Sequence, residues 1–151
     1  MPVKKLKDFL DSNNIKYVTI SHSPAYTAQQ VAASSHISGK EVAKTVMVKI
    51  DNEIAMAVLP ASCKVNMELL KGTIKADKIE LASEHEFKDL FPGCDCGAMP
   101  PFGNLYGMDV YVAENLAKDE EIAFNAGSHT ELIRLAYKDF EHLVQPKELK
   151  F

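Results

Sequence analysis

The chain has 151 residues, a length typical of one domain and sufficient to bury a hydrophobic core. Apolar residues make up 46% and charged residues 25%, which excludes a disordered or collagen-like chain. The net charge of −4 disfavours DNA binding and any broad nucleic-acid groove, because phosphate contacts dominate such binding. No apolar run has the length of a membrane helix, and no signal peptide is evident. We therefore expect a single cytoplasmic domain, residues 1–151, without membrane contact.

The N-terminal part of the chain predicts two helices and a strand. Apolar residues recur every three or four positions over residues 3–12, which is typical of a helix. The β-branched and aromatic residues of 17–21 predict a strand. Thr27-Ala-Gln-Gln30 is a capping box and predicts a second helix that extends to about His36.

The next segments predict a β-hairpin. Residues 44–50 and 53–59 are strand-like, and the turn pair Asp51-Asn52 joins them. We expect this hairpin at the centre of the sheet. Beyond it, Asn66 caps a short helix that ends at Gly72.

Strands and helices alternate irregularly in the rest of the chain. Residues 78–81 predict a strand, and the capping box Ser83-Glu-His-Glu86 begins a helix that Pro92-Gly93 ends.

The C-terminal third adds strands at 109–113 and 121–125. Residues 132–136 fit either a strand or a helix, and we favour a strand, followed by a helix over 137–144. The connections are too short for a doubly wound sheet. The sequence thus predicts a mixed α/β fold.

Metal and covalent chemistry have little support. An odd number of cysteines (Cys63, Cys94 and Cys96) argues against a disulfide framework. Cys94-Asp-Cys96 resembles half of a zinc site, but no second ligand cluster accompanies it. We expect free thiols, no metal and no cofactor. A nucleophile paired with His129 is conceivable, but nothing in the spacing supports it.

Lys44 opens an apolar strand and has two interpretations. Its ammonium group can extend to water at the strand end while its stem packs on apolar neighbours. Alternatively, it is a fixed cation at a pocket mouth that holds a phosphate or carboxylate through charge-assisted hydrogen bonds.

Two further segments are unusual. Gly97-Ala-Met-Pro-Pro-Phe-Gly103 combines conformationally free and restricted residues, so it is either a rigid connection or a backbone preorganised for a ligand. Asn125-Ala-Gly-Ser-His-Thr130 places a histidine in a turn of small residues. His129 either caps or packs there, or contacts substrate as a hydrogen-bonding or acid/base group. His85 and His142 fall on predicted surface helices, where we expect them to be solvated.

Together these segments resemble the YbaK/ProX family of free-standing aminoacyl-tRNA deacylases, which is similar to the editing insertion domain of bacterial prolyl-tRNA synthetase. The matching stretches occur in the family's order and span about residues 16–140. They are His22-Ser-Pro-Ala-Tyr-Thr-Ala, Val42-Ala-Lys-Thr-Val-Met-Val, Gly97-Ala-Met-Pro-Pro-Phe-Gly-Asn and Phe124-Asn-Ala-Gly-Ser-His-Thr. The resemblance implies a curved mixed β-sheet or partial barrel surrounded by helices.

The resemblance also implies roles for single residues. Lys44 anchors the phosphate of the terminal adenosine of the tRNA, and the loop from Gly97 to Pro101 lines the aminoacyl pocket and orients ester and water. Lys44, Gly97 and Pro101 are therefore the expected catalytic residues. The expected substrate-binding residues are Thr45, Met99, Gly127, Ser128 and His129. Tyr26 and Phe102 are further candidates for the pocket lining.

The implied reaction is hydrolysis of a mischarged aminoacyl-tRNA in trans, with tRNA for proline carrying alanine or another small residue as the expected substrate. The ester is already activated, so positioning a water and stabilising an oxyanion can suffice, with help from the vicinal ribose hydroxyl. The expected partner is the acceptor end of the tRNA, and prolyl-tRNA synthetase is a candidate second partner. Two alternatives stay open: a non-catalytic module that binds an aminoacyl end or a synthetase, and an esterase for another small ester.

Overall fold

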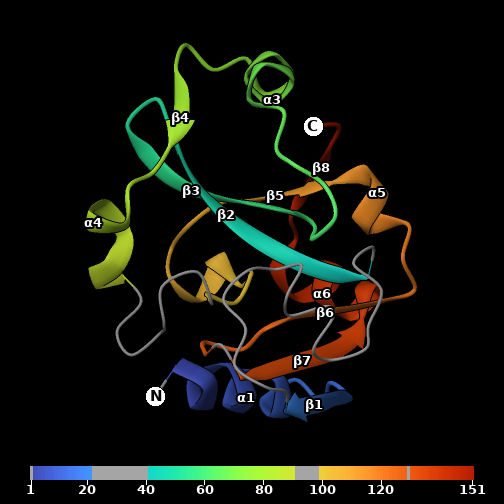
Figure 1. The fold of residues 1–151 in the computed structure, drawn as a ribbon. Helices are drawn as coiled ribbons and strands as arrows, with labels where there is room; N and C mark the ends of the chain where they lie inside the picture. The colour runs from blue at the N-terminus through green and yellow to red at the C-terminus, as the bar shows by residue number, and fades with distance from the viewer. Residues whose placement is uncertain (1, 22–40, 91–98, 129) are drawn as a thin grey trace.

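In the computed structural model, residues 2–21, 41–90, 99–128 and 130–151 are described. They form an eight-stranded mixed sheet of order β1-β7-β6-β2-β3-β5-β8, with β4 paired to β2 beside this path (Figure 1). The pairs β2–β6, β3–β5 and β5–β8 are parallel and the others antiparallel. The strands are Tyr17–Ser21 (β1), Val42–Ile50 (β2), Glu53–Pro60 (β3), Ile79–Leu81 (β4), Val110–Ala113 (β5), Glu121–Asn125 (β6), Glu131–Ala136 (β7) and Lys147–Leu149 (β8).

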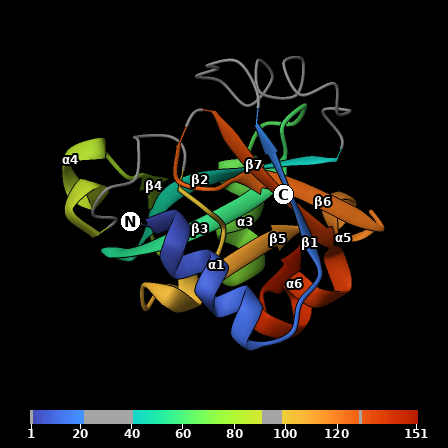
Figure 2. The ribbon, with the colours of Figure 1, turned by 90° about the horizontal axis from the view of Figure 1, so that it is seen from below.

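Helices cover both faces of the sheet. One face, here called the inner face, packs against α1 and α6, which lie on the same side (Figure 2). The opposite, outer face packs against α3. The helices are Pro2–Ser12 (α1), Met67–Ile74 (α3), Glu84–Phe87 (α4), Glu114–Ala117 (α5) and Tyr137–Val144 (α6), with one-turn 3₁₀ helices at Lys88–Leu90 and Gly103–Leu105.

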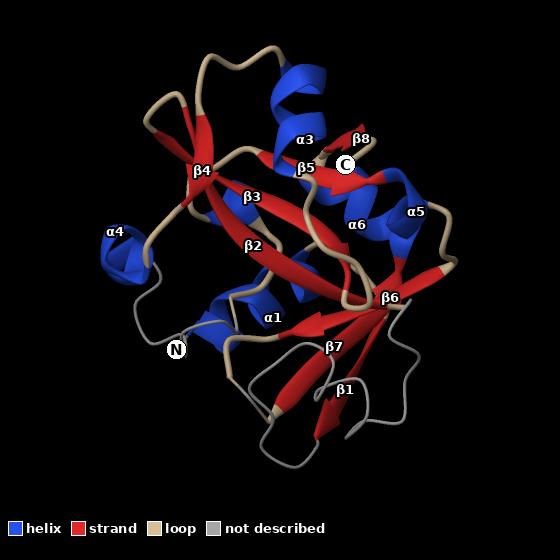
Figure 3. Ribbon diagram, turned by 45° about the horizontal axis from the view of Figure 1, so that its top comes forward, coloured by secondary structure: helices blue, strands red, loops and turns tan. Residues whose placement is uncertain are grey.

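Side-chain alternation along the strands separates the two faces. The main core lies on the inner face and contains Met47, Met56, Phe124 and Ile133, together with Phe140 of α6. The outer face carries two smaller clusters. One lies beneath α3, and the other consists of Val42, Ala61, Ala123 and Leu132, with Ile20 packed against it. Figure 3 shows β6, β7 and β1 turned steeply away from β2 and β3, so the sheet is strongly twisted.

The central hairpin of β2 and β3 forms around the predicted turn pair, Asp51-Asn52. Asp51 and Asn52 have φ values of 48° and 74°, the left-handed pair that a two-residue hairpin turn requires. The Asp51 carboxylate also accepts hydrogen bonds from the backbone N–H groups of Asp77 and Lys78 at 3.0 and 2.8 Å. This contact fixes the start of β4 against the hairpin.

Most predicted elements are confirmed, including the choice of a strand for β7 and the exposed positions of His85 and His142. The predicted end of α3 at Gly72 is wrong. Asn66 caps the helix by accepting from the Leu69 N–H at 3.0 Å, but the helix continues to Ile74, where Lys75 adopts φ 57°. Gly72 therefore remains helical, and a lysine takes the left-handed position.

Other differences are local. The short α5 and β8 were not expected, because four and three residues carry too little periodicity. The capping box at Ser83 forms in part, since the Glu86 carboxylate accepts from the Ser83 N–H at 3.2 Å. The expected helix at 27–36 and the stop at Pro92-Gly93 lie outside the described residues. Within the described ranges, no helix is long and apolar enough to cross a membrane.

Candidate active site

The sheet has a break beside β2. On one edge, β2 pairs with β6 through Val42 and Ala43, and on the same edge it pairs with β4 only from Val48 onward. The Met47 carbonyl still accepts from the Ala82 N–H at 3.0 Å, so in the described part of the chain residues 44–46 of β2 lack a partner strand on this edge. The turn that follows β6 begins at this break, because Phe124 is paired with Ala43. The register thus places the backbone of Lys44 and Thr45 beside the end of β6, and Gly127 and Ser128 lie in the turn that follows β6.

Lys44 is a half-buried cation on the outer face. It lies opposite the buried Leu59 on β3 and two positions along from Val42, and so borders the small cluster of Val42, Ala61, Ala123 and Leu132. Burial lowers the pKa of the Lys44 ammonium; Cys63 opposes this shift and Lys64 adds to it. Among the described residues, none forms an ion pair or hydrogen bond with Lys44. The ammonium is thus partly desolvated and, within the described ranges, unpaired.

Thr45 lies on the other face. It pairs with Val58, a main-core residue, so its side chain belongs to the inner face although it follows Lys44 directly. Thr45 is half-buried, and its contribution to a site on the outer face would come from its backbone at the break. The side chains of Lys44 and Thr45 therefore do not form one contact surface.

The turn after β6 is tightly built. Gly127 is buried with φ 106°, a conformation that side-chain-bearing residues rarely adopt. The Ala126 N–H donates to the Glu131 carbonyl at 3.1 Å, and the Thr130 N–H donates to Ser128 Oγ at 3.4 Å. His129 lies outside the described residues.

An ion pair fixes the turn to the first helix. Lys7 Nζ of α1 donates to Glu131 Oε1 at 2.8 Å, and both side chains are only partly exposed. Beside them, Ser128 lines a cavity of about 520 Å³ whose other walls are Tyr17 and charged residues of α1. No local sequence pattern predicts this contact, because its partners are 124 positions apart.

The proline segment enters the main core. Met99, Pro100 and Pro101 are buried, and Met99 belongs to the main core with an exposed fraction of 5%. Phe102 is fully buried, and its ring lies 5.4 Å from both Phe124 and Phe140. This segment is thus held rigidly by packing. Gly97 lies outside the described residues.

Sequence reasoning passed over several polar groups near Lys44. Asn125 and Arg134 lie on the same face of the sheet as Lys44, since each is two positions along its strand from a member of the small outer cluster. Their Oδ1 and Nε atoms are buried without a hydrogen-bond partner in the described part of the chain. On the other side, Asn115 Nδ2 donates to Cys63 Sγ at 3.4 Å. These polar neighbours of Lys44 are found only from the pairing of the strands, because none of them belongs to a recognisable sequence motif.

Metal ligands are not gathered at this site. Among the described residues, no three His, Cys, Asp or Glu side chains lie together in a way that could hold a metal ion. Cys63 is a free, half-buried thiol, and Cys94 and Cys96 lie outside the described ranges. A half-buried cation on the strand at the break and a tight glycine turn after the neighbouring strand are features that suit the binding of an anionic substrate, while the described part of the proline segment packs in the main core.

Comparison with known proteins identifies the family. The model of the aminoacyl-tRNA editing domain family matches residues 22–143, so the chain belongs to that family. It is an aminoacyl-tRNA deacylase of YbaK/ProX type, an ester hydrolase that acts in editing. The alternative of a non-catalytic module is therefore not retained.

Individual relatives agree with this assignment. The chain is 26% identical to the multifunctional Ser/Thr-tRNA deacylase ProXp-y of Escherichia coli K12, over 98% of this chain and 91% of that protein. It is 23% identical to the prolyl-tRNA editing protein ProX of Acetoanaerobium sticklandii, over 90% and 86%. The fold matches the crystal structure of a candidate trans-editing enzyme for prolyl-tRNA synthetase with a TM-score of 0.82 and 16% identity, covering 99% and 95% of the two chains.

Proposed function

We propose that this protein removes a small amino acid from mischarged tRNA, with alanine on tRNA for proline as its main substrate, and that it works in the cytoplasm. The observation that carries the proposal is the half-buried Lys44 at the break in the sheet, which has no ion-pair partner among the described residues. Its ammonium holds the phosphate of the terminal adenosine through a charge-assisted hydrogen bond. The ester then extends toward the rigid segments that border the break.

The remaining site residues have positioning roles in this proposal. The backbone of the Gly97–Pro101 loop orients ester and water, with Met99 behind it as part of the packed wall. Gly127, Ser128 and His129 border the same pocket, and Thr45 contributes its backbone. The bound ester needs no dedicated protein base, because the vicinal ribose hydroxyl can assist attack by water.

General limits on selectivity predict which other amino acids are removed. Val42, Ala61, Ala123 and Leu132 beside Lys44 are at most 2% exposed, so they support the site from behind rather than contact the substrate. An apolar pocket that accepts the methyl group of alanine discriminates only weakly, by about a hundredfold at most, against a similar side chain that adds a hydroxyl. Serine, and to a lesser extent threonine, are therefore the expected secondary substrates, a preference that the E. coli relative carries in its name.

Release of amino acid from a panel of charged tRNAs tests the proposal. The panel contains tRNA for proline charged with alanine, serine, threonine, cysteine or proline, and alanine on its own tRNA. We expect the fastest release from alanyl-tRNA for proline, slower release of serine, and no release of proline. Addition of prolyl-tRNA synthetase tests that candidate partner through an increase in rate at limiting tRNA. Fast release of proline, or a rate independent of the amino acid, would contradict the proposal.

The Lys7–Glu131 ion pair is expected to position the turn that borders the pocket. Lys7→Met and Glu131→Gln each remove a partly buried contact worth about 1 kcal/mol, so we expect kcat to fall about fivefold for each. The charge-swapped double variant Lys7→Glu/Glu131→Lys should regain part of the rate. Steady-state kinetics on the best substrate of the panel, alongside melting curves, check this. A double variant as slow as the product of the two single losses would show that the pair has no positioning role.

A further inference from the structure

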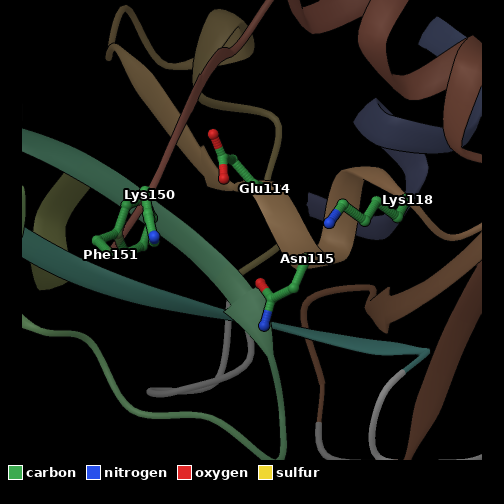
Figure 4. Close-up of a pocket in the computed structure, with 5 residues that line it drawn as sticks. All are labelled: Glu114, Asn115, Lys118, Lys150 and Phe151. Atoms are coloured by element: carbon green, nitrogen blue, oxygen red, sulfur yellow. The ribbon is translucent and has the colours of Figure 1, made fainter.

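A second cavity lies next to the Lys44 site, at the α5 end of the sheet. It has a volume of about 360 Å³ and is lined by Glu114, Asn115, Lys118, Lys150 and Phe151. Figure 4 shows the α5 residues on one side of it and Lys150 with Phe151 on the other. None of these residues belongs to a motif of the family resemblance.

The cavity and Lys44 are linked through Cys63. Asn115, which lines the cavity, donates to Cys63 Sγ at 3.4 Å and so joins the cavity to the segment that follows β3. Cys63 and its neighbour Lys64 are close enough to Lys44 to act on the pKa of its ammonium. A chain that leaves the phosphate at Lys44 in this direction therefore passes Lys64 and reaches the cavity.

The charges along this path favour a polyanion. Lys64, Lys118 and Lys150 are exposed, and within the described ranges none of them has an ion-pair or hydrogen-bond partner. Lys118 remains unpaired even though Glu114 lines the same cavity. In a protein with a net charge of −4, these three lysines form a local positive path.

The lining of the cavity fits one nucleotide. Two ammonium groups suit a phosphate, and the ring of Phe151 offers a face on which a base can stack. The Glu114 carboxylate and the Asn115 amide can accept from an exocyclic amino group, such as that of cytosine. Phe151 packs against the outer-face cluster beneath α3, so its ring is held in place by the fold.

We infer that this cavity binds a nucleotide of the single-stranded acceptor end of the tRNA, upstream of the terminal adenosine held by Lys44. The inference rests on the proposed function, because it assumes that the phosphate of the terminal adenosine lies at Lys44. It gives an acidic protein a defined second contact with its tRNA, through one nucleotide rather than through the body of the molecule.

The test compares two substrates that share the same aminoacyl ester. One is the best charged tRNA of the panel, and the other is the same amino acid esterified to adenosine 5′-monophosphate, which lacks the upstream nucleotides. The variants are Lys118→Ala, Lys150→Ala and their combination. Lys16→Ala is the matched control, since Lys16 is also exposed but adjoins β1, at the opposite end of the sheet from β8.

For the double variant, kcat/KM on the charged tRNA should fall about tenfold or more, whereas kcat/KM on the aminoacyl ester of adenosine 5′-monophosphate should not change. The dependence of tRNA affinity on salt should also weaken, with the slope of log affinity against log salt decreasing by about one for each lysine removed. A purely structural role of these lysines would not change this slope. The control variant should match the wild type on both substrates.

Several results would overturn the inference: an unchanged rate on charged tRNA, an equal loss on both substrates, or an unchanged salt slope. In another outcome, free cytidine monophosphate inhibits hydrolysis of the ester of adenosine 5′-monophosphate while the lysine variants hydrolyse charged tRNA at the wild-type rate. That result would assign the cavity to a free nucleotide instead. A wild type that hydrolyses neither substrate would contradict the proposed function. Filter binding of uncharged tRNA by the same variants would then still show whether the cavity binds the tRNA.

Discussion

Replacement of Lys44 by alanine should lower kcat/KM for the mischarged tRNA by about 10–100-fold. A hydrogen bond between a charged group and its partner contributes about 1.5–3 kcal/mol, and Lys44 is the cation that the proposal assigns to the terminal phosphate. The fold should tolerate this change, because Lys44 is half-buried and forms no ion pair within the described ranges. Single-turnover release of the amino acid and a melting curve measure the two effects separately. A wild-type rate in the alanine variant would exclude Lys44 as the anchor.

The pH dependence supplies an internal control for this prediction. Because burial lowers the pKa of Lys44 below the ordinary 10.5, its positive charge is lost earlier than usual as the pH rises into the alkaline range. Affinity for uncharged tRNA should therefore fall over this alkaline range in the wild type. Lys44→Arg keeps its charge throughout, so its affinity should not show this decrease. Equal alkaline decreases in the two proteins would mean that another group titrates.

The sequence predicts the parts of this site that depend on local patterns. The apolar strand around Lys44, the turn pair Asp51-Asn52 and the small residues of the turn at Gly127 each have a local signature, and the structure forms all three as expected. Alternation within a strand also follows from the sequence. It separates Thr45 from Lys44, although a grouping by motif alone places the two side chains together.

Contacts that join distant parts of the chain have no such signature. The ion pair of Lys7 with Glu131 and the hydrogen bond of Asn115 with Cys63 bridge 124 and 52 positions, and they depend on the strand order of the complete sheet. The same holds for Asn125 and Arg134, which share a face with Lys44 through the register of β6 with β7 and of β2 with β6. Local preference can also mislead, since Lys75 rather than Gly72 adopts the left-handed conformation at the end of α3.

Replacement of Phe102 by alanine should cost much more stability than the substitutions of Lys7, Lys44 or Glu131. Phe102 is fully buried, and its ring contacts the rings of Phe9, Phe124 and Phe140 at centroid distances of 6.3, 5.4 and 5.4 Å. Truncation of such a residue costs about 3–5 kcal/mol, a large part of the roughly 5–15 kcal/mol that stabilises a typical domain. For a chain of this length, we expect Tm to fall by on the order of 10 °C.

The same substitution should also impair catalysis, because Phe102 directly follows the buried Met99-Pro100-Pro101 segment and holds it against the main core. Phe140→Ala is the matched control, since Phe140 is equally buried in the same aromatic cluster but belongs to α6. At a temperature where both variants are folded, we expect similar losses of Tm but a larger loss of kcat for Phe102→Ala. Equal losses of kcat would show that the cluster acts only through global stability. A loss confined to Phe102→Ala would instead assign the aromatic cluster a part in fixing the loop that orients the ester.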